Sequence, residues 1–249
     1  MKQIPLAVVA ALDEELRIIR SKMDIDSRVH LRPALFEEGT YLKKPLLLVR
    51  SGIGLKAMGH AIGRCLESYR PDFCLHVGYC GGADPYYQAG DLLIADEVVD
   101  AASKARYKPD SASVERALGI CKERALRGGI GTLVTVAEAI ASPHEKAFVG
   151  TEHGAHGIDM ESSILASACE EKGVGYLVVR AVLDPMDVAL PDMCDVINEE
   201  GEADSLALAE HMIKKPRDIL SLPRLQYFAS AARGAIAAFV EEWIERGAS

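Results

Sequence analysis

Residues 157–184 constrain the fold of this chain more than any other stretch of its sequence. Apolar and small side chains recur there at helical spacing, at Ile164, Leu165, Ala168 and Cys169, which predicts a helix that Glu161 opens. A continuous aliphatic and aromatic run over 176–182 is typical of a strand that is buried on both faces. Asp184 follows this strand at its carboxyl end, which is the edge where open α/β sheets bind their ligands. The stretch therefore predicts an α/β fold with one carboxylate at a helix start and another at the ligand edge of a sheet.

The rest of the chain alternates between strand-like apolar runs and helical segments. Strands are predicted over 5–11, 29–38, 44–51, 73–78, 92–99 and 131–136, and helices over 13–23, 55–69, 111–127, 143–153, 203–213 and 225–245. No repeat or linker interrupts this order, which predicts a single domain over residues 1–249 with a helical C-terminal extension from about residue 192. The predicted architecture is a three-layer α/β/α domain with a mixed, mainly parallel central sheet.

The composition argues against several classes of protein. The 249 residues carry a formal net charge of −9 and no long basic run, so nucleic acid is not expected as a partner. No uncharged apolar stretch is long enough to span a membrane, and the N-terminal apolar run is too short for a secretion signal. The six cysteines lack CxxC or zinc spacing and lie mostly in apolar segments. We therefore expect a cytoplasmic protein with reduced cysteines.

The acidic residues near predicted helix and strand ends have two interpretations. Residues 13–15 are three consecutive acids at a helix start, where the helix dipole alone would favour them. The same effect would explain Glu161, and a loop-capping role would explain Asp184. The functional alternative is that one acid of the 13–15 turn points over the strand end as a base. Spacing alone does not decide between these interpretations.

Two glycine-rich segments follow predicted strands and could bring the backbone close to a ligand. Residues 51–54 read Ser-Gly-Ile-Gly before a helix, where backbone N–H groups can bind an anion or a sugar hydroxyl. Residues 78–82 read Gly-Tyr-Cys-Gly-Gly, which also permits close approach of the backbone. Neither segment matches the GxGxxG pattern of dinucleotide-binding proteins.

Five segments are informative as an ordered set: AVVAALDEEL, SGIG, HVGYCGGADPYYQAGDLLIADEVV, GTLVTVAEAI and IDMESSILASACEEKGVGYLVVRAVLD. In order and spacing this set, which extends over residues 5–184, resembles the nucleoside phosphorylase superfamily. It is most similar to the methylthioadenosine/S-adenosylhomocysteine nucleosidase branch. The resemblance implies a phosphorylase/hydrolase-like fold and cleavage of the N-glycosidic bond of a nucleoside. The second substrate is water in the nucleosidases and phosphate in the phosphorylases.

The resemblance also implies roles for individual residues. Asp184 corresponds to the acid that protonates the purine at N7, which relieves charge on the departing base. Glu161 corresponds to the carboxylate that holds the ribose hydroxyls, and Glu15 to the acid that orients or deprotonates the attacking water, with Arg180 near the same pocket. The other implied substrate contacts are Met160 on the sugar face, Ala139 and Ile140 at the base, Gly81 and Gly82 beneath the nucleoside, and Tyr79. No metal or organic cofactor is implied.

The second substrate is the first point at which this sequence departs from the family pattern. Phosphorylases have an arginine at the position of His76 and a phosphate-binding hydroxyl at the position of Tyr79. The acidic turn 13–15 replaces their phosphate cradle, and like charges in a confined site repel each other. We therefore favour water over phosphate, with His76 and Gly54 as candidates for a phosphate or water site. The alternative for His76 is a core histidine hydrogen-bonded to the backbone.

The base pocket and the C-terminal region also depart from the nucleosidases. Ala139 and Leu183 stand where nucleosidases have an aromatic residue and a serine. The C-terminal region resembles that of the hopanoid-associated phosphorylase group, which acts on an adenosyl group attached to a polycyclic lipid. Basic and apolar side chains gather there: Lys214, Lys215, Arg217, Ile219, Leu220, Leu222, Arg224, Leu225 and Phe228. Such a surface could contact a membrane peripherally, or it could belong to an ordinary packed helix pair.

The sequence thus predicts an N-glycosidase that uses water to release a purine, with adenine as the expected base, from a 5′-substituted nucleoside. One alternative is a phosphate-dependent purine nucleoside phosphorylase, including one that acts on an adenosylhopane-type lipid nucleoside. Another is an inactive nucleoside-binding protein, which the substitutions at Tyr79, Ala139 and Leu183 leave open. The family resemblance further implies a homo-oligomer, either a dimer or a trimer of dimers.

Overall fold

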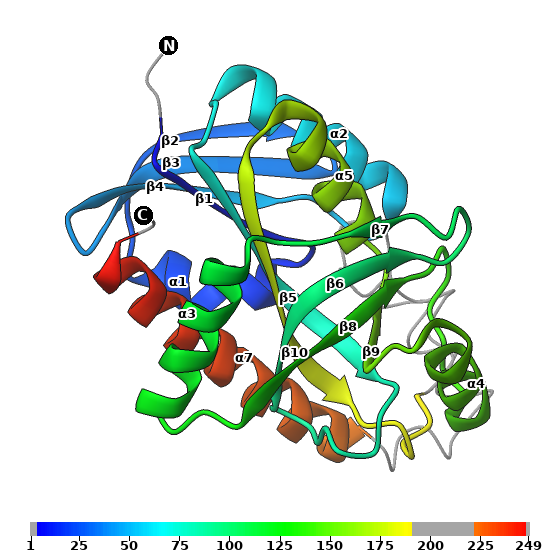
Figure 1. The fold of residues 1–249 in the computed structure, drawn as a ribbon. Helices are drawn as coiled ribbons and strands as arrows, with labels where there is room; N and C mark the ends of the chain where they lie inside the picture. Colours follow the sequence, from blue (N-terminus) through cyan, green and yellow to red (C-terminus); the bar gives the residue numbers. More distant parts are fainter. Residues whose placement is uncertain (1–3, 191–221, 248–249) are drawn as a thin grey trace, which may run out of the picture.

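The computed structural model describes residues 4–190 and 222–247 (Figure 1). Its strands are β1 Leu6–Ala10, β2 Asp24–Leu31, β3 Ala34–Tyr41, β4 Lys44–Arg50, β5 Phe73–Gly82, β6 Leu92–Asp100, β7 Arg106–Tyr107, β8 Gly128–Thr135, β9 Gly157–Asp159 and β10 Gly175–Asp184. Its helices are α1 Asp13–Ser21, α2 Leu55–Ser68, α3 Ser111–Glu123, α4 Pro143–His153, α5 Ser162–Lys172 and α7 Leu222–Arg246.

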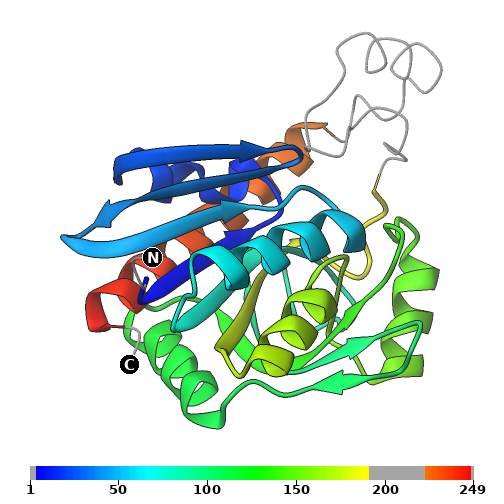
Figure 2. The same cartoon turned by 90° about the horizontal axis from the view of Figure 1, so that it is seen from above.

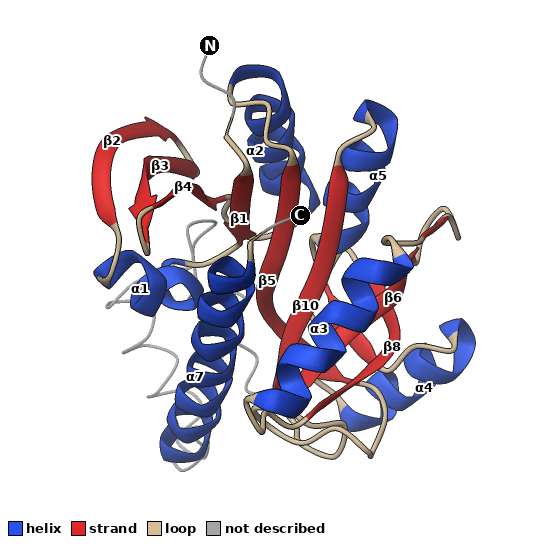
Figure 3. Cartoon of the chain, turned by 60° about the vertical axis from the view of Figure 1, so that its left-hand side comes forward, coloured by secondary structure: helices blue, strands red, loops and turns tan. Residues whose placement is uncertain are grey.

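Helices cover both faces of the central sheet because its inner strands are apolar on both sides. In β1, Leu6, Val8 and Ala10 pack with α1, α3 and α7, whereas Ala7 and Val9 pack with α2 and α5. Figure 3 shows α2 and α5 on one side of β1, β5 and β10, and α3 and α7 on the other. The predicted three-layer α/β/α architecture is therefore confirmed.

The sheet is mixed, and part of it closes on itself. Its order is β10-β6-β8-β9-β5-β1-β4-β3-β2, with β7 paired to β6 and a further pairing between β10 and β5. Consequently β5, β10, β6, β8 and β9 form a closed circuit of strands. The pairs β1–β4, β1–β5, β5–β10, β6–β8 and β8–β9 are parallel, whereas β10 runs antiparallel to β6 and β9 antiparallel to β5. The circuit brings the ends of strands that are distant in sequence around one space.

The strands β2, β3 and β4 form an antiparallel arm that extends from β1 (Figure 2, blue). The sequence predicted one strand over 29–38, and this prediction is wrong. The structure has two strands, β2 and β3, with a turn at Arg32-Pro33 between them. Most β2 side chains are exposed, so this strand lacks the apolar pattern by which the others were found.

The helices that flank the later strands begin and end at recognisable residues. Helix α4 begins at Pro143 and ends before Gly154, which has a φ of 63°. Helix α5 begins after Glu161 and ends before Gly173, which has a φ of 66°. Helix α3 is shorter than the predicted helix 111–127 and ends at Glu123, and the short strand β7 lies just before this helix.

The C-terminal helix α7 belongs to the main core. Its Phe239, Val240 and Trp243 are buried in the same cluster as side chains of α1 and α3, and the guanidinium of Arg116 lies 4.1 Å from the centre of the Trp243 ring. The predicted helix 203–213 and five residues of the basic and apolar segment lie outside the described residues: Lys214, Lys215, Arg217, Ile219 and Leu220. Nowhere in residues 4–190 and 222–247 is a helix long and apolar enough to cross a membrane.

Candidate active site

A cavity lies where β1, β5, β9 and β10 end, beside the starts of α1 and α5. Eight of the predicted site residues line it: Glu15, Tyr79, Gly81, Ala139, Ile140, Met160, Glu161 and Asp184. Gly54, His76, Gly82 and Arg180 were also predicted for the site, but they do not line this cavity. The structure thus brings eight of the predicted residues, three carboxylates among them, to one cavity, whereas the other four lie elsewhere in the structure.

An irregularity at the end of β10 shapes one wall of the cavity. Val182 pairs with Cys80 and Asp184 pairs with Gly81, so Leu183 is an extra residue with no partner on β5. In a regular strand Leu183 and Asp184 would point to opposite faces. The bulge changes the direction of the chain, and both residues line the cavity. Gly81 lies beside the carboxylate, since a Cβ there would be 3.4 Å from Oδ2 of Asp184, at ordinary contact distance.

The carboxylate of Glu15 is held at the cavity by two backbone N–H groups. Tyr79 N–H donates to Oε1 at 2.7 Å and Leu12 N–H donates to Oε2 at 2.8 Å. Burial raises the pKa of Glu15, and the nearby Arg180 and these N–H groups oppose the rise. The other two acids of the turn do not line the cavity, because Asp13 pairs with Arg20 and Glu14 pairs with Arg17.

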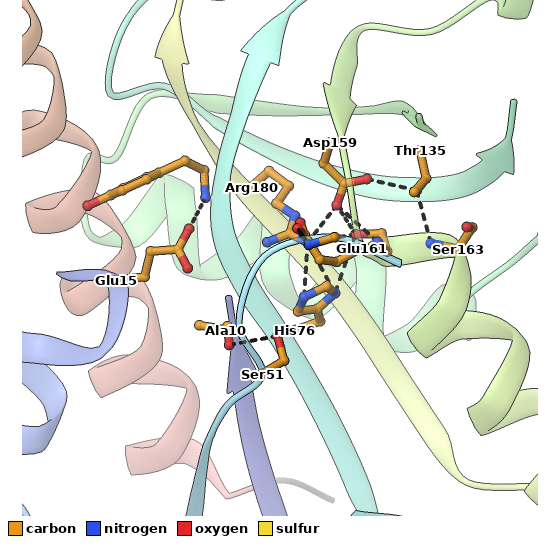
Figure 4. Close-up of polar contacts among 12 residues, drawn as sticks. Ala10, Glu15, Ser51, His76, Thr135, Asp159, Glu161, Ser163 and Arg180 are labelled. Atoms are coloured by element: carbon orange, nitrogen blue, oxygen red, sulfur yellow. Dashed lines mark hydrogen bonds and ion pairs between the residues drawn. The ribbon is translucent and has the colours of Figure 1, made fainter. Parts of the chain in front are cut away.

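Arg180 does not line the cavity, but it contacts one of the carboxylates that do, Asp159 (Figure 4). Its Nη2 donates to Oδ2 of Asp159 at 2.6 Å and to Oγ of Ser162 at 2.9 Å, and it lies 2.9 Å from Nε2 of His76. Burial lowers the pKa of Arg180, but the surrounding carboxylates, Asp159 first, outweigh burial and raise it overall. Arg180 therefore stays charged and offsets the negative charge around the cavity.

Glu161 is a strongly perturbed carboxyl group of the cavity wall. It occupies the N-cap position of α5, and its Oε1 accepts a hydrogen bond from Gly54 N–H at 2.7 Å. Burial and then the negative charge of Asp159 raise the pKa of Glu161 to about 8, against the effects of Arg180 and Gly54. This shift favours the protonated form of Glu161, which can both donate and accept a hydrogen bond.

Asp184 forms an ion pair with a fully buried lysine. Its Oδ2 contacts Nζ of Lys146, which also donates to the carbonyl oxygens of Val188, at 2.6 Å, and Pro185, at 3.3 Å. Burial raises the pKa of Asp184 to about 6, although Lys146 acts in the opposite direction. Asp184 is thus poised to exchange a proton close to neutral pH.

The cavity is acidic and otherwise apolar. Four carboxyl groups line it, from Glu15, Asp159, Glu161 and Asp184. No lysine, arginine or histidine is among the lining residues, within the part of the chain that the structure describes. The same part of the chain contains no group of three His, Cys, Asp or Glu side chains that could hold a metal ion. The lining thus offers hydrogen-bonding groups and apolar contacts to a ligand but no cationic side chain to an anion.

Three of the predicted residues have surroundings that differ from those expected. His76 is fully buried and contacts Arg180 and Ser162, so the expected backbone hydrogen bond is replaced by side-chain contacts. Burial and then Arg180 lower the pKa of His76 well below its ordinary value, so the ring is neutral. Tyr79 lines the cavity, but its ring packs against the apolar cluster that includes α1 and α7. Gly82 lies against the backbone of Pro185, where a Cβ would come within 3.2 Å.

Comparison with known proteins establishes the family of the chain. The sequence profile described as the Phosphorylase superfamily matches residues 5–215. The chain belongs to this superfamily. Among its relatives is a 5′-methylthioadenosine/S-adenosylhomocysteine nucleosidase from Geobacillus thermodenitrificans, which is 31% identical over 197 residues that cover 72% of this chain and 83% of the relative.

Two solved structures share the fold of this chain. A 5′-methylthioadenosine/S-adenosylhomocysteine nucleosidase from Neisseria meningitidis, in complex with methylthio-immucillin-A, matches with a TM-score of 0.72 and 20% identity over 96% of this chain and 99% of that chain. Futalosine hydrolase from Helicobacter pylori also matches with a TM-score of 0.72, at 18% identity over 96% of this chain and 98% of that chain. These likenesses confirm the predicted phosphorylase/hydrolase-like fold.

The sequence analysis did not identify three residues that shape the site. Asp159 accepts hydrogen bonds from Arg180, Ser162 and Thr135. Its place in the Gly-Ile-Asp-Met-Glu segment, two residues before Glu161, was the available signal. Gly78 was seen only as part of a glycine-rich strand end, although a Cβ there would collide with the Arg180 guanidinium. Lys146 was assigned no role in the site, since an isolated lysine in a predicted helix is ordinarily a surface residue.

Proposed function

We propose that this chain is an N-glycosidase that releases a purine from a 5′-substituted nucleoside and transfers the sugar to water. The observation that carries the proposal is that Asp184, Glu161 and Glu15 line one cavity with otherwise apolar walls. The nucleosidase from Geobacillus thermodenitrificans, a relative within the same superfamily, supports it. Adenine is the base that we propose, because the related nucleosidases are named for adenosine-derived substrates.

Each carboxyl group has a proposed part in the reaction. Asp184, whose pKa is about 6, donates a proton to the purine as the glycosidic bond breaks. Glu161 binds the ribose hydroxyls, with Met160 packed on the sugar. Glu15, which is held by the N–H groups of Leu12 and Tyr79, accepts a proton from the attacking water. No metal or organic cofactor enters this scheme.

The charges of the cavity favour water over phosphate. A phosphate dianion would face up to four carboxyl groups without a cationic side chain among the described lining residues. Arg180 is a candidate for a phosphate partner, but its Nη2 is engaged by Asp159, Ser162 and His76. Water is neutral and avoids this repulsion, so we propose hydrolysis and not phosphorolysis.

The decisive experiment measures purine release from adenosine-type nucleosides of increasing 5′ bulk, with and without phosphate. We expect release without phosphate, and at least a 100-fold loss of activity in Asp184→Asn. Asp187→Asn is the matched control, because Asp187 is an exposed carboxylate of the segment after β10. Formation of a sugar 1-phosphate would identify a phosphorylase, and tight binding without release would identify a nucleoside-binding protein. Release only from nucleosides with a lipid-like 5′ group would indicate the adenosylhopane type of substrate.

We further propose a cytoplasmic location and a homo-oligomeric state. Buried free thiols at Cys65, Cys74, Cys80, Cys121 and Cys169 are compatible with a reducing compartment. We also propose peripheral membrane contact near the start of α7. There the guanidinium of Arg224 lies 5.1 Å from the centre of the Phe228 ring, and Tyr227 is exposed. Sedimentation of the protein alone and with anionic vesicles tests the oligomeric state and the membrane contact respectively.

A further inference from the structure

Lys146 is a fully buried lysine on α4, the helix between β8 and β9. Burying an ammonium group without partners is very costly, so its partners are informative. Its ammonium group forms an ion pair with Oδ2 of Asp184 and donates hydrogen bonds to the carbonyl oxygens of Val188 and Pro185. The side chain of Lys146 does not line the cavity. Its contacts are with Asp184 itself and with the chain immediately after it.

This arrangement restricts what Asp184 can do. Because Oδ2 is engaged by Lys146, Oδ1 is the oxygen left to contact a ligand in the cavity. Lys146 also fixes the segment that follows β10 through Pro185 and Val188. The same segment contributes Leu190 to the cavity wall, where its N–H donates to Ala141 at 3.1 Å. One ammonium group thus holds both the carboxylate and the wall beside it.

We propose that Lys146 is a positioning residue for protonation of the leaving base: it directs Oδ1 of Asp184 into the cavity and stabilises the carboxylate that forms there. This inference rests on the proposed N-glycosidase function. In the step concerned, the C1′–N bond breaks and its electron pair stays on the base. The proton of Asp184 moves to the base, Asp184 becomes a carboxylate, and Lys146 keeps its proton. Water then adds to C1′ and gives a proton to Glu15.

The charges around Asp184 support this role. From α4 it faces Lys146, and from the neighbouring β5 it faces the thiol of Cys80, whose pKa burial raises strongly. Lys146 is the cation that lowers the pKa of Asp184, against the effect of burial. Without Lys146, the pKa of Asp184 would rise further and the group would become a weaker acid. The lysine therefore favours the ionised product of proton transfer.

Substrates that differ in their leaving group test the proposal. A purine needs protonation to depart, whereas 4-nitrophenolate departs from 4-nitrophenyl β-D-ribofuranoside without it. In Lys146→Met, we expect kcat/KM for purine release to fall at least about tenfold, and to fall much less for the nitrophenyl riboside. Lys146→Arg retains the charge and should restore part of the purine activity. Lys104→Met is the control. It removes an exposed lysine that forms an ion pair with Glu152, a residue of α4, the helix that also carries Lys146.

A second measurement separates positioning from general destabilisation. The alkaline limb of the pH profile for purine release should move to higher pH in Lys146→Met, because Asp184 then holds its proton more tightly. In an Asp184→Asn background, Lys146→Met should cause little further loss. Equal loss with both leaving groups, an unmoved limb, or full additivity with Asp184→Asn would each overturn the proposal. If the unmodified protein releases no purine from any nucleoside, the proposed function fails instead.

Discussion

The pKa of Glu161 makes a direct prediction about stability. Its ordinary value of 4.5 rises to about 8 in the folded protein, because burial and then Asp159 oppose ionisation. When a carboxyl group holds its proton more tightly in the folded protein than in the unfolded chain, its contribution to the free energy of unfolding is lost as pH rises. For Glu161 this loss occurs from about pH 4.5 to about pH 8. The full difference corresponds to about 5 kcal/mol at high pH. Part of this difference is shared with the neighbouring carboxylates. We therefore expect a variant that cannot ionise at position 161 to gain about 2–5 kcal/mol in the free energy of unfolding at high pH.

The substitution Glu161→Gln removes the charge and keeps the oxygen that accepts from Gly54 N–H. Denaturant unfolding should show the variant within about 1 kcal/mol of the unmodified protein at about pH 5, and more stable by about 2–5 kcal/mol at about pH 9. Glu138→Gln, at an exposed position, should change stability by less than about 0.5 kcal/mol at either pH. A stability difference that is the same at both pH values would refute the reasoning.

Three further predictions concern the same site. Gly78→Ala should lower the free energy of unfolding by about 1–3 kcal/mol, because its Cβ would lie 2.7 Å from Oε1 of Glu15 and collide with Arg180; unchanged denaturant curves would contradict this. Arg180→Met should cost about 3–5 kcal/mol at neutral pH by leaving Asp159 buried without its cation, and chemical denaturation measures the loss. Finally, kcat/KM for purine release should decline as pH rises through about 6, because Asp184 must be protonated to act as an acid. A profile that is flat from about pH 5 to about pH 8 would exclude that role.

The sequence was sufficient for the parts of the fold that bury continuous apolar runs. Strands β1, β5 and β10 were found because they are apolar on both faces, and parallel strands place their carboxyl ends at one edge. In the structure, Glu15, which follows β1, lines the same cavity as Asp184 of β10. The family resemblance then supplied their proposed roles, which spacing alone could not do.

Other features depend on tertiary contacts that leave little trace in the sequence. Strand β9 has only three residues, Gly157–Asp159. Its pairing with both β8 and β5, more than the strand propensity of its residues, makes this segment a strand. The bulge at Leu183 arises from a register shift between two strands. Lys146 becomes a buried cation only because Asp184 and two carbonyl groups surround it in the folded chain. In each case, a partner that is distant in sequence decides the outcome.

The closed circuit of strands has a consequence for the growing polypeptide. During synthesis, β5 and β6 emerge well before β10, the strand that pairs with both of them. Until residues 175–184 leave the ribosome, each of these strands lacks a neighbour and offers an edge to which other chains can pair. The same ten residues also bring Asp184. A nascent or truncated chain that stops before β10 is thus prone to association with other chains and also lacks Asp184. Addition of β10 covers the open strand edges and supplies Asp184 at the same time.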